Sequence, residues 1–293
     1  MLKGIVVSNK SNLYKVEVNN KIYDCFARGK IKNIDISPVA GDIVAIKLQN
    51  EEENNGIIEE IAERKNYIKR PKMANLSQII FVVSMKMPKP DLLLLDKQLV
   101  YAEHKNIKPI ICLNKIDLED EEKINNIYEL YKSIGYDVIK TNAKEEIGVE
   151  EIKKCLENNI TAFSGNSGVG KSTLINGIMG KNITEEGNIS HKNKKGKNTT
   201  TQVNLYKIKE NSYIADTPGF STFDVNEIEK EELAKYFVEF KDYLNQCEYA
   251  DCSHIKEEKC GIKKAMAEGK ISKERYERYC QIYEELKSKK KVY

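Results

Sequence analysis

Residues 163–177 read FSGNSGVGKSTLING, and this stretch decides the fold of the central part of the chain. It fits the pattern G-x-x-x-x-G-K-[ST] from Gly165 to Ser172, after an apolar strand (160–163) and before a helix. The glycines allow successive backbone N–H groups to form a nest for phosphate oxygens, and the helix N-terminus adds partial positive charge. The sequence therefore predicts a phosphate-binding loop.

This loop supplies most of the predicted nucleotide contacts. We expect Lys171 to reach the β- and γ-phosphates and the Ser172 hydroxyl to ligate Mg²⁺. The residues expected to contact the nucleotide here are Gly165, Asn166, Ser167, Gly168, Val169, Gly170, Lys171, Ser172 and Thr173. The loop alone does not distinguish ATP from GTP.

The sequence NKID at 114–117 predicts the base. It follows the apolar run PIICL, and in such a loop the Asp117 carboxylate accepts from N1–H and the exocyclic amine of guanine. The Asn114 amide meets the Hoogsteen edge, and Lys115 lays its stem along the nucleotide beside Ile116. Adenine has an acceptor at N1, which cannot donate to the Asp117 carboxylate. We therefore expect guanine to be preferred over adenine by a factor on the order of 10⁴.

Three further segments complete the predicted site. TNAK (141–144) resembles the S-A-K loop whose backbone N–H, here at Ala143, contacts guanine O6. Asp216-Thr-Pro-Gly219 looks like the D-x-x-G motif that holds Mg²⁺ through water and offers the Gly219 N–H to the γ-phosphate. Thr200, or its neighbour Thr199, is the expected switch threonine, although a Thr-rich loop could also be inert. The residues expected to act in catalysis are Lys171, Ser172, Thr200, Asp216 and Gly219.

The order of these motifs is rotated. In the common guanine-nucleotide fold the phosphate loop comes first, whereas here NKID and TNAK precede it. Domain termini usually lie close together at the surface, so joining them and cutting elsewhere preserves the sheet. The sequence therefore predicts a circularly permuted domain. Phe220 follows DTPG where Ras-type enzymes have a Gln that orients water, so intrinsic hydrolysis should be slow.

Other segments flank this domain. Residues 1–62 read as five short strands, with a hairpin turn at Asn19-Asn20, and predict a small barrel of the OB type, a shape often used on RNA. Tyr14, Tyr23 and Phe26 could offer stacking faces, but filling of the barrel is the favoured interpretation for each. From 76, apolar strands alternate with helices at 91–105, 119–134 and 147–157, a pattern typical of a doubly wound parallel sheet. From 227 onward the chain reads as helical.

A cysteine and histidine cluster lies near the C-terminus. Cys247-x4-Cys252-x-His254-x5-Cys260 offers three thiolates and one imidazole, which predicts a structural zinc site with no open position for water. Metal binding would supply folding energy to this polar segment. The remaining cysteines, Cys25, Cys112, Cys155 and Cys280, are interpreted as ordinary thiols, since seven cysteines without an export signal argue against a disulfide framework.

Composition and charge limit the class of protein. The residues are 40% apolar and 32% charged, and the longest apolar runs fall far short of the roughly 20 residues that span a bilayer. We therefore expect a cytoplasmic protein with no membrane contact. The net charge of +3 is too small to indicate nucleic-acid binding by itself. Basic stretches at 64–72 and 191–201 nevertheless favour a polyanionic partner.

Along essentially its whole length the chain resembles the small-ribosomal-subunit-dependent GTPases of bacteria, the RsgA family. The shared features are the barrel, NKID, GNSGVGKST, the T-T pair, DTPGF and the C-terminal cluster. Two positions depart from the family pattern: Lys197-Asn198 replaces R-H before the threonines, and Asn142 replaces the usual Ser. The first departure leaves the role of a switch histidine in doubt.

The resemblance implies an N-terminal all-β OB-like barrel (1–70, RNA-binding), a central α/β circularly permuted P-loop GTPase domain (71–222) and a C-terminal α-helical zinc-binding domain (223–293). It implies binding to the small ribosomal subunit and its rRNA, late maturation of that subunit, and subunit-stimulated hydrolysis of GTP to GDP and phosphate. The expected cofactors are one structural Zn²⁺ and Mg²⁺ with GTP, and a monomer is expected. Two alternatives stay open: a GTPase of another class with a protein activator, and a binding protein whose nucleotide only locks a conformation.

Overall fold

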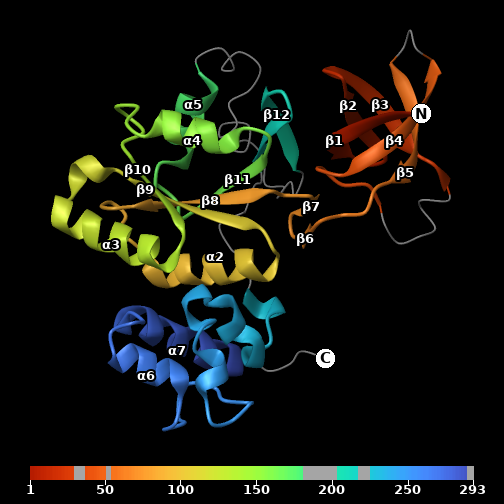
Figure 1. Cartoon of the computed structure of the whole chain (residues 1–293). Coiled ribbons are helices and arrows are strands. Elements are labelled where there is room, and N and C mark those ends of the chain that lie inside the picture. The colour runs from red at the N-terminus through yellow and green to blue at the C-terminus, as the bar shows by residue number, and fades with distance from the viewer. Residues whose placement is uncertain (30–36, 51–53, 181–202, 217–224, 289–293) are drawn as a thin grey trace.

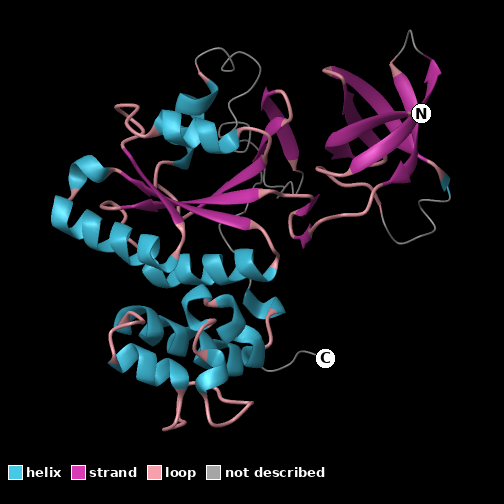
Figure 2. Cartoon of the chain, viewed as in Figure 1, coloured by secondary structure: helices cyan, strands magenta, loops and turns pink. Residues whose placement is uncertain are grey.

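The computed structural model describes residues 1–29, 37–50, 54–180, 203–216 and 225–288 (Figure 1). Within these ranges the chain forms a strand barrel, a sheet covered by helices on both faces, and a helical C-terminal part (Figure 2). No helix in these ranges is both long and apolar enough to cross a membrane.

The N-terminal strands close into a barrel with its own core. The strands are β1 (Leu2–Lys10), β2 (Leu13–Val18), β3 (Lys21–Ala27), β4 (Ile43–Asn50) and β5 (Asn55–Ile61). Antiparallel pairing joins β1 to β2, β2 to β3, β4 to β5 and β1 to β4, and a parallel β3–β5 pair closes the ring. Positive φ angles of 49° and 68° at Asn19 and Asn20 confirm the predicted hairpin turn. The predicted OB-like barrel is thus confirmed.

The aromatic residues of the barrel divide between its inside and its outside. Tyr14 and Tyr23 are 4% and 8% exposed and fill the barrel, as predicted. The same prediction was wrong for Phe26, which is 54% exposed. Side chains alternate between the two faces of a strand, and the burial pattern of β3 places Phe26 on the outer face.

A short segment connects the barrel to the central sheet. Arg64 donates to both carboxylate oxygens of the fully buried Asp42, at 2.7 Å each. The hairpin of β6 (Tyr67–Lys69) and β7 (Lys72–Ala74) follows, and Met73 pairs with Ala40. Ile68 and Met73 belong to the core under the central sheet, so the hairpin packs on that domain as well.

The central sheet is doubly wound. Its strands are β8 (Gln78–Ser84), β9 (Lys108–Asn114), β10 (Asp137–Thr141), β11 (Ile160–Ser164), β12 (Asn204–Lys209) and β13 (Ser212–Asp216), in the order β10-β9-β8-β11-β13-β12. All neighbouring pairs are parallel except β12–β13. All seven residues of β8 are buried, which explains the continuous apolar run. One pair, Ser8 with Asn204, joins β12 to the barrel strand β1.

Helices cover both faces of this sheet (Figure 1). One face carries α2 (Leu92–His104) and α3 (Glu121–Ile134), and the other carries α4 (Val149–Leu156) and α5 (Lys171–Met179). Asp91 caps α2 by accepting from the Leu94 N–H at 2.9 Å. Gly135 ends α3 in the left-handed conformation, with φ of 107°. Its N–H donates to the carbonyl oxygens of Lys132 and Tyr131. Both boundaries follow the turn chemistry of the sequence.

The C-terminal part packs against α2 on the side away from the sheet (Figure 1). It is helical, as predicted, but much of it is 3₁₀ rather than α. The elements are η4 (Val225–Glu227), η5 (Lys230–Tyr236), η6 (Val238–Phe240), η7 (Leu244–Gln246), α6 (Gly261–Ala267) and α7 (Lys273–Ser288). Its apolar core includes Val100 of α2, so this helix is shared by two domains.

Candidate functional site

The predicted motifs meet at one edge of the central sheet. β8, β9, β10 and β11 are parallel, so their carboxyl ends lie at the same edge. The loops at 114–117, 141–144 and 165–170 follow three of these strands. Ligands of doubly wound folds bind at this edge. The structure therefore brings together segments far apart in the sequence, such as Asn114 and Val169, which are 55 residues apart.

Asn114 holds the three loops together. Its side chain is 1% exposed, and Nδ2 donates to the Val169 carbonyl at 2.8 Å. Its Oδ1 accepts from Thr141 Oγ1 at 3.0 Å and from the Ala143 N–H at 3.2 Å. The predicted base-binding and phosphate-binding segments therefore form one unit.

Two glycines of the phosphate loop are required by close approaches. Gly170 has φ of 101°, and a Cβ there would lie 2.3 Å from Asn114 Nδ2. Gly165 has φ of 143°, and a Cβ there would lie 2.2 Å from the Val82 carbonyl oxygen. A side chain at either position would displace the loop from its neighbours.

Lys115 crosses from the base-binding segment to the phosphate loop. It has φ of 61°, and Nζ donates to the carbonyls of Gly168 at 2.7 Å and Met87 at 2.5 Å. Ile116 and Asp117 follow in the 3₁₀ turn η1 (Ile116–Leu118), where Asp117 is exposed. At this position the Asp117 carboxylate can accept hydrogen bonds from the N–H groups of a purine whose phosphates lie in the phosphate loop.

Lys171 lies over the loop that it terminates. Its Nζ donates to the carbonyls of Gly165 at 2.6 Å and Asn166 at 2.8 Å, and burial lowers its pKa. Ser172 and Thr173 are exposed in the first turn of α5, and no side chain caps this helix. The free N–H groups of that turn favour an anion.

Asp216 ends β13 beside the phosphate loop. The β11–β13 pairing places Ala215 opposite Ala162, three residues before Gly165. Burial raises the pKa of Asp216 to about 6, and a nearby divalent cation would favour the ionised form. Thr199, Thr200, Gly219, Phe220 and Asn198 lie outside the described residues.

The sequence did not predict the contact between α2 and the phosphate loop. Gln98 of α2 is 2% exposed, and its Nε2 donates to Ser164 Oγ at 3.2 Å. Ser164 directly precedes Gly165 of the loop. The only sequence signal for this contact is a polar residue, Gln98, on an otherwise apolar helix face. That signal does not predict which residue Gln98 contacts.

The four residues of the predicted metal site converge. The ligand atoms of Cys247, Cys252, His254 and Cys260 all lie within 4.8 Å of one another. His254 Nδ1 is 3.4 Å from the Sγ atoms of Cys247 and Cys260, which are 3.9 Å apart. Sulfur ligands on a tetrahedral ion with bonds of about 2.3 Å lie about 3.8 Å apart. The cluster could hold a metal ion.

The neighbouring residues fix this cluster. Tyr276 and Tyr279 of α7 donate to the carbonyls of His254 at 2.7 Å and Ser253 at 2.9 Å. Burial and the adjacent thiols raise the pKa of Cys252 to about 12, so the thiolate form needs a cation. A bound metal would supply that charge.

Comparison with known families and proteins agrees with this geometry. A family model described as RsgA GTPase matches residues 61–226, and one described as RsgA N-terminal domain matches residues 3–58. Two curated relatives are named small ribosomal subunit biogenesis GTPase RsgA. The relative from Clostridium novyi is 43% identical over 97% of each chain, and one from Clostridium botulinum is 40% identical over 99% of each.

Two solved structures are similar over nearly the full chain. YjeQ from Thermotoga maritima has a TM-score of 0.85 at 38% identity, covering 99% of each chain. YloQ, whose structure is described as a circularly permuted GTPase, has a TM-score of 0.83 at 32% identity, covering 100% of this chain and 97% of its own. The predicted permutation is thereby confirmed. The chain belongs to the RsgA family of circularly permuted GTPases and is a GTP hydrolase.

Proposed function

We propose that this GTPase binds the small ribosomal subunit, contacts its rRNA and assists its late maturation. The observation that carries the proposal is 40% identity over 99% of the chain to a protein named for small ribosomal subunit biogenesis. The proposed place of action is the cytoplasm, and the proposed form is a monomer. The domain limits at 70 and 222 stay predictions.

The proposed nucleotide site uses residues on both sides of Asn114. Asp117 and the Ala143 N–H read guanine, while Lys171 and the N–H groups of residues 165–173 neutralise the phosphates. When bound, Mg²⁺ would neutralise phosphate charge, with Ser172 as ligand and Asp216 acting through water. Thr200 and Gly219, outside the described residues, complete the predicted catalytic set.

The residue after DTPG supports the proposed stimulation of hydrolysis by the subunit. Phe220 cannot orient water, so a group elsewhere must do so. We expect turnover of GTP to rise at least about tenfold with purified small subunits, measured as phosphate release over many turnovers. Lys171→Ala and purified large subunits serve as controls. Equal turnover across a titration of small subunits would refute the proposal.

The barrel is the proposed RNA contact. Phe26 exposes 54% of its surface on the outer face of β3, and pairing places Leu13 and Ile57 beside it on neighbouring strands. Aromatic faces next to basic groups stack bases of single-stranded nucleic acid. Phe26→Ala should weaken co-sedimentation with small subunits and leave its salt dependence nearly unchanged, because the ring neutralises no phosphate.

The proposed metal at the cysteine cluster is one structural Zn²⁺. Three thiols and one imidazole are the donors that zinc prefers, and four protein ligands leave no position for a reacting water. Native mass spectrometry should find one zinc per chain. A metal-free protein with an unchanged C-terminal fold, or an unchanged fold in Cys252→Ala, would contradict this assignment.

A further inference from the structure

The barrel contains a cavity that the nucleotide and metal sites do not use. It has a volume of about 450 Å³ and lies where β1 and β3 begin and β4 ends. Sites for small molecules usually measure about 300–1,000 Å³. The lining residues are Met1, Leu2, Lys21, Tyr23, Ile46, Lys47 and Leu48.

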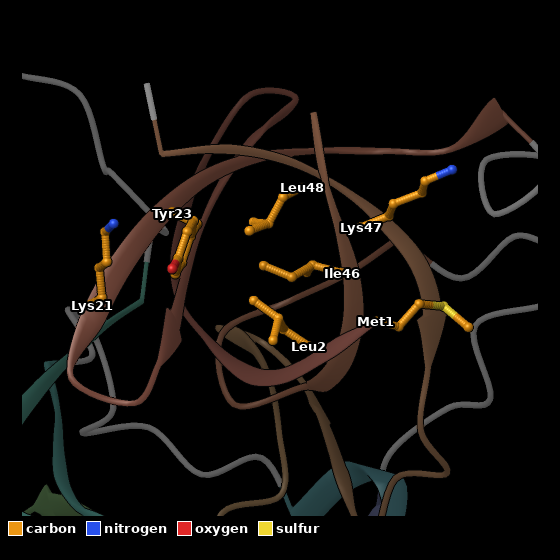
Figure 3. Close-up of a pocket in the computed structure, with 7 residues that line it drawn as sticks. All are labelled: Met1, Leu2, Lys21, Tyr23, Ile46, Lys47 and Leu48. Atoms are coloured by element: carbon orange, nitrogen blue, oxygen red, sulfur yellow. The ribbon is translucent and has the colours of Figure 1, made fainter. Parts of the chain in front are cut away.

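The inner wall is apolar. Leu2, Tyr23, Ile46 and Leu48 point toward the middle of the ring of strands (Figure 3). Ile46 is fully buried and Tyr23 is 8% exposed, and both belong to the barrel core. Leu2 and Leu48 pack on that core while remaining partly exposed. The wall is therefore held in place by the barrel and favours a flat apolar group.

The rim is cationic. Lys21 and Lys47 are exposed and lie on opposite sides of the opening (Figure 3). Lys21 Nζ lies 5.3 Å from the centre of the Tyr23 ring. Among the described residues, no carboxylate lines the cavity and neither lysine forms an ion pair. These two charges are available to an anionic ligand.

We propose that this cavity receives one unstacked base of single-stranded RNA, with the flanking phosphates on Lys21 and Lys47. The proposal rests on the RNA contact proposed for the barrel and adds a site distinct from the outer face that carries Phe26. An apolar, aromatic wall suits a base, and two separated cations suit the phosphates on either side of it. Because Tyr23 supplies the one side-chain hydroxyl in the lining, the choice among bases should be weak.

The test compares two probes of equal charge on the full-length protein. One is a fluorescein-labelled decaadenylate, and the other is an abasic ribose-phosphate decamer of the same length. We expect the wild type to bind decaadenylate at least about tenfold more tightly, since stacking of one base contributes that much. Equal affinities would overturn the proposal without any variant having to fold.

Variants then locate the binding. Leu48→Trp fills the cavity without changing charge and should reduce the preference for the decamer with bases by the contribution of one stacked base, leaving what Phe26 contributes. The double variant K21A/K47A should weaken both probes and lower the slope of log affinity against log salt by about 1.4, or 0.7 per phosphate. The double variant K3A/K10A removes two exposed lysines of the same barrel and should keep the preference.

Other outcomes would overturn the assignment. If Leu48→Trp has the wild-type melting temperature and keeps the full base preference, the base lies elsewhere. Binding of dodecanoate that decaadenylate does not displace would assign the cavity to an acyl chain. Co-sedimentation of the wild type with small subunits is measured separately, so failure of the proposed function remains distinguishable from failure of the cavity proposal.

Discussion

At the residue scale, we propose that one carboxylate, Asp117, decides which purine is accepted. Asp117 is exposed in η1 and follows Lys115, whose Nζ reaches the phosphate loop. In Asp117→Asn an amide donor would face the guanine amine, whereas xanthine offers an acceptor there. We expect GTP affinity to fall at least about 100-fold and XTP affinity to rise, by titration of fluorescent nucleotides.

A neighbouring carboxylate provides the matched control. Glu119 forms an ion pair with Lys123 in the adjacent turn, so Glu119→Gln makes the same change of charge two residues away. That variant should keep GTP affinity within about twofold. If both variants lose affinity equally, charge near the site and not recognition by Asp117 is responsible.

The proposed role of Asp216 opposes the stability of the folded chain. Its pKa in the folded chain is raised to about 6, so its contribution to stability is present below the unfolded pKa of about 4 and is lost as pH rises through about 6. In the absence of nucleotide, Asp216→Asn should raise the melting temperature by about 2–4 °C at pH 7.5 and by less at pH 5. With GTP present, the same variant should lose Mg²⁺-dependent hydrolysis.

An exposed aspartate tests this explanation. Asp137 has 47% of its side chain exposed, so Asp137→Asn should leave melting and hydrolysis nearly unchanged at both pH values. An unchanged melting temperature of Asp216→Asn at pH 7.5 would show that the buried carboxylate does not destabilise the protein.

At the element scale, α2 connects the phosphate loop to the C-terminal part. Gln98 contacts Ser164 before the loop, while Asp96 accepts from Arg275 and Arg278 of α7. Asp96 and Arg275 are fully buried, and Tyr131 Oη donates to Asp96 at 2.7 Å. Burial alone would lower the pKa of Arg275, but the charges of Asp96 and Glu239 outweigh it and raise this pKa. The two helices are therefore held by a buried ion-pair network.

Breaking that network should cost much more than breaking a surface pair between the same helices. Asp96→Asn leaves Arg275 buried with less compensation, so we expect a loss of about 3 kcal/mol in the free energy of unfolding, measured with urea. Lys97→Ala removes the pair with Glu285, whose side chain is 42% exposed, and should cost less than about 1 kcal/mol. Equal losses of unfolding free energy in the two variants would mean that the buried network does not determine how α7 packs on α2.

The elements also show what the sequence could and could not predict. The phosphate loop, NKID and the cysteine cluster are local patterns, because each needs a fixed spacing of a few residues to bind its ligand. The Asp96–Arg275 pair joins positions 179 residues apart, and neither position has a sequence signal for the other. The exposure of Phe26 depends on which face of β3 turns outward, and the stretch of aromatic and basic residues does not fix that. Helical composition after 227 likewise did not distinguish 3₁₀ from α turns.

At the scale of the whole molecule, the cores are unequally connected. The C-terminal core includes Val100 of α2, and the central core includes Val7 of β1, whereas the core inside the barrel takes no described residue from beyond β5. Within the part of the chain that the structure describes, strand pairing joins barrel and sheet only at Ser8 with Asn204. Packed cores open as cooperative units, so the central and C-terminal parts should respond together to a ligand, and the barrel should respond less.

Amide hydrogen exchange measured by mass spectrometry can test this coupling. Ligand binding to the folded state slows exchange wherever opening would release the ligand. Saturating GDP and Mg²⁺ should therefore slow exchange in α2 and α7 at least about threefold, while exchange in β2 and β3 of the barrel changes by less than that. The Asp96→Asn variant is the internal control, because it should keep slowing in α2 and lose it in α7. No slowing in α7 of the wild type would show that α2 does not couple the central and C-terminal parts. Equal slowing in the barrel strands would show that the barrel is coupled to the site as tightly as α7.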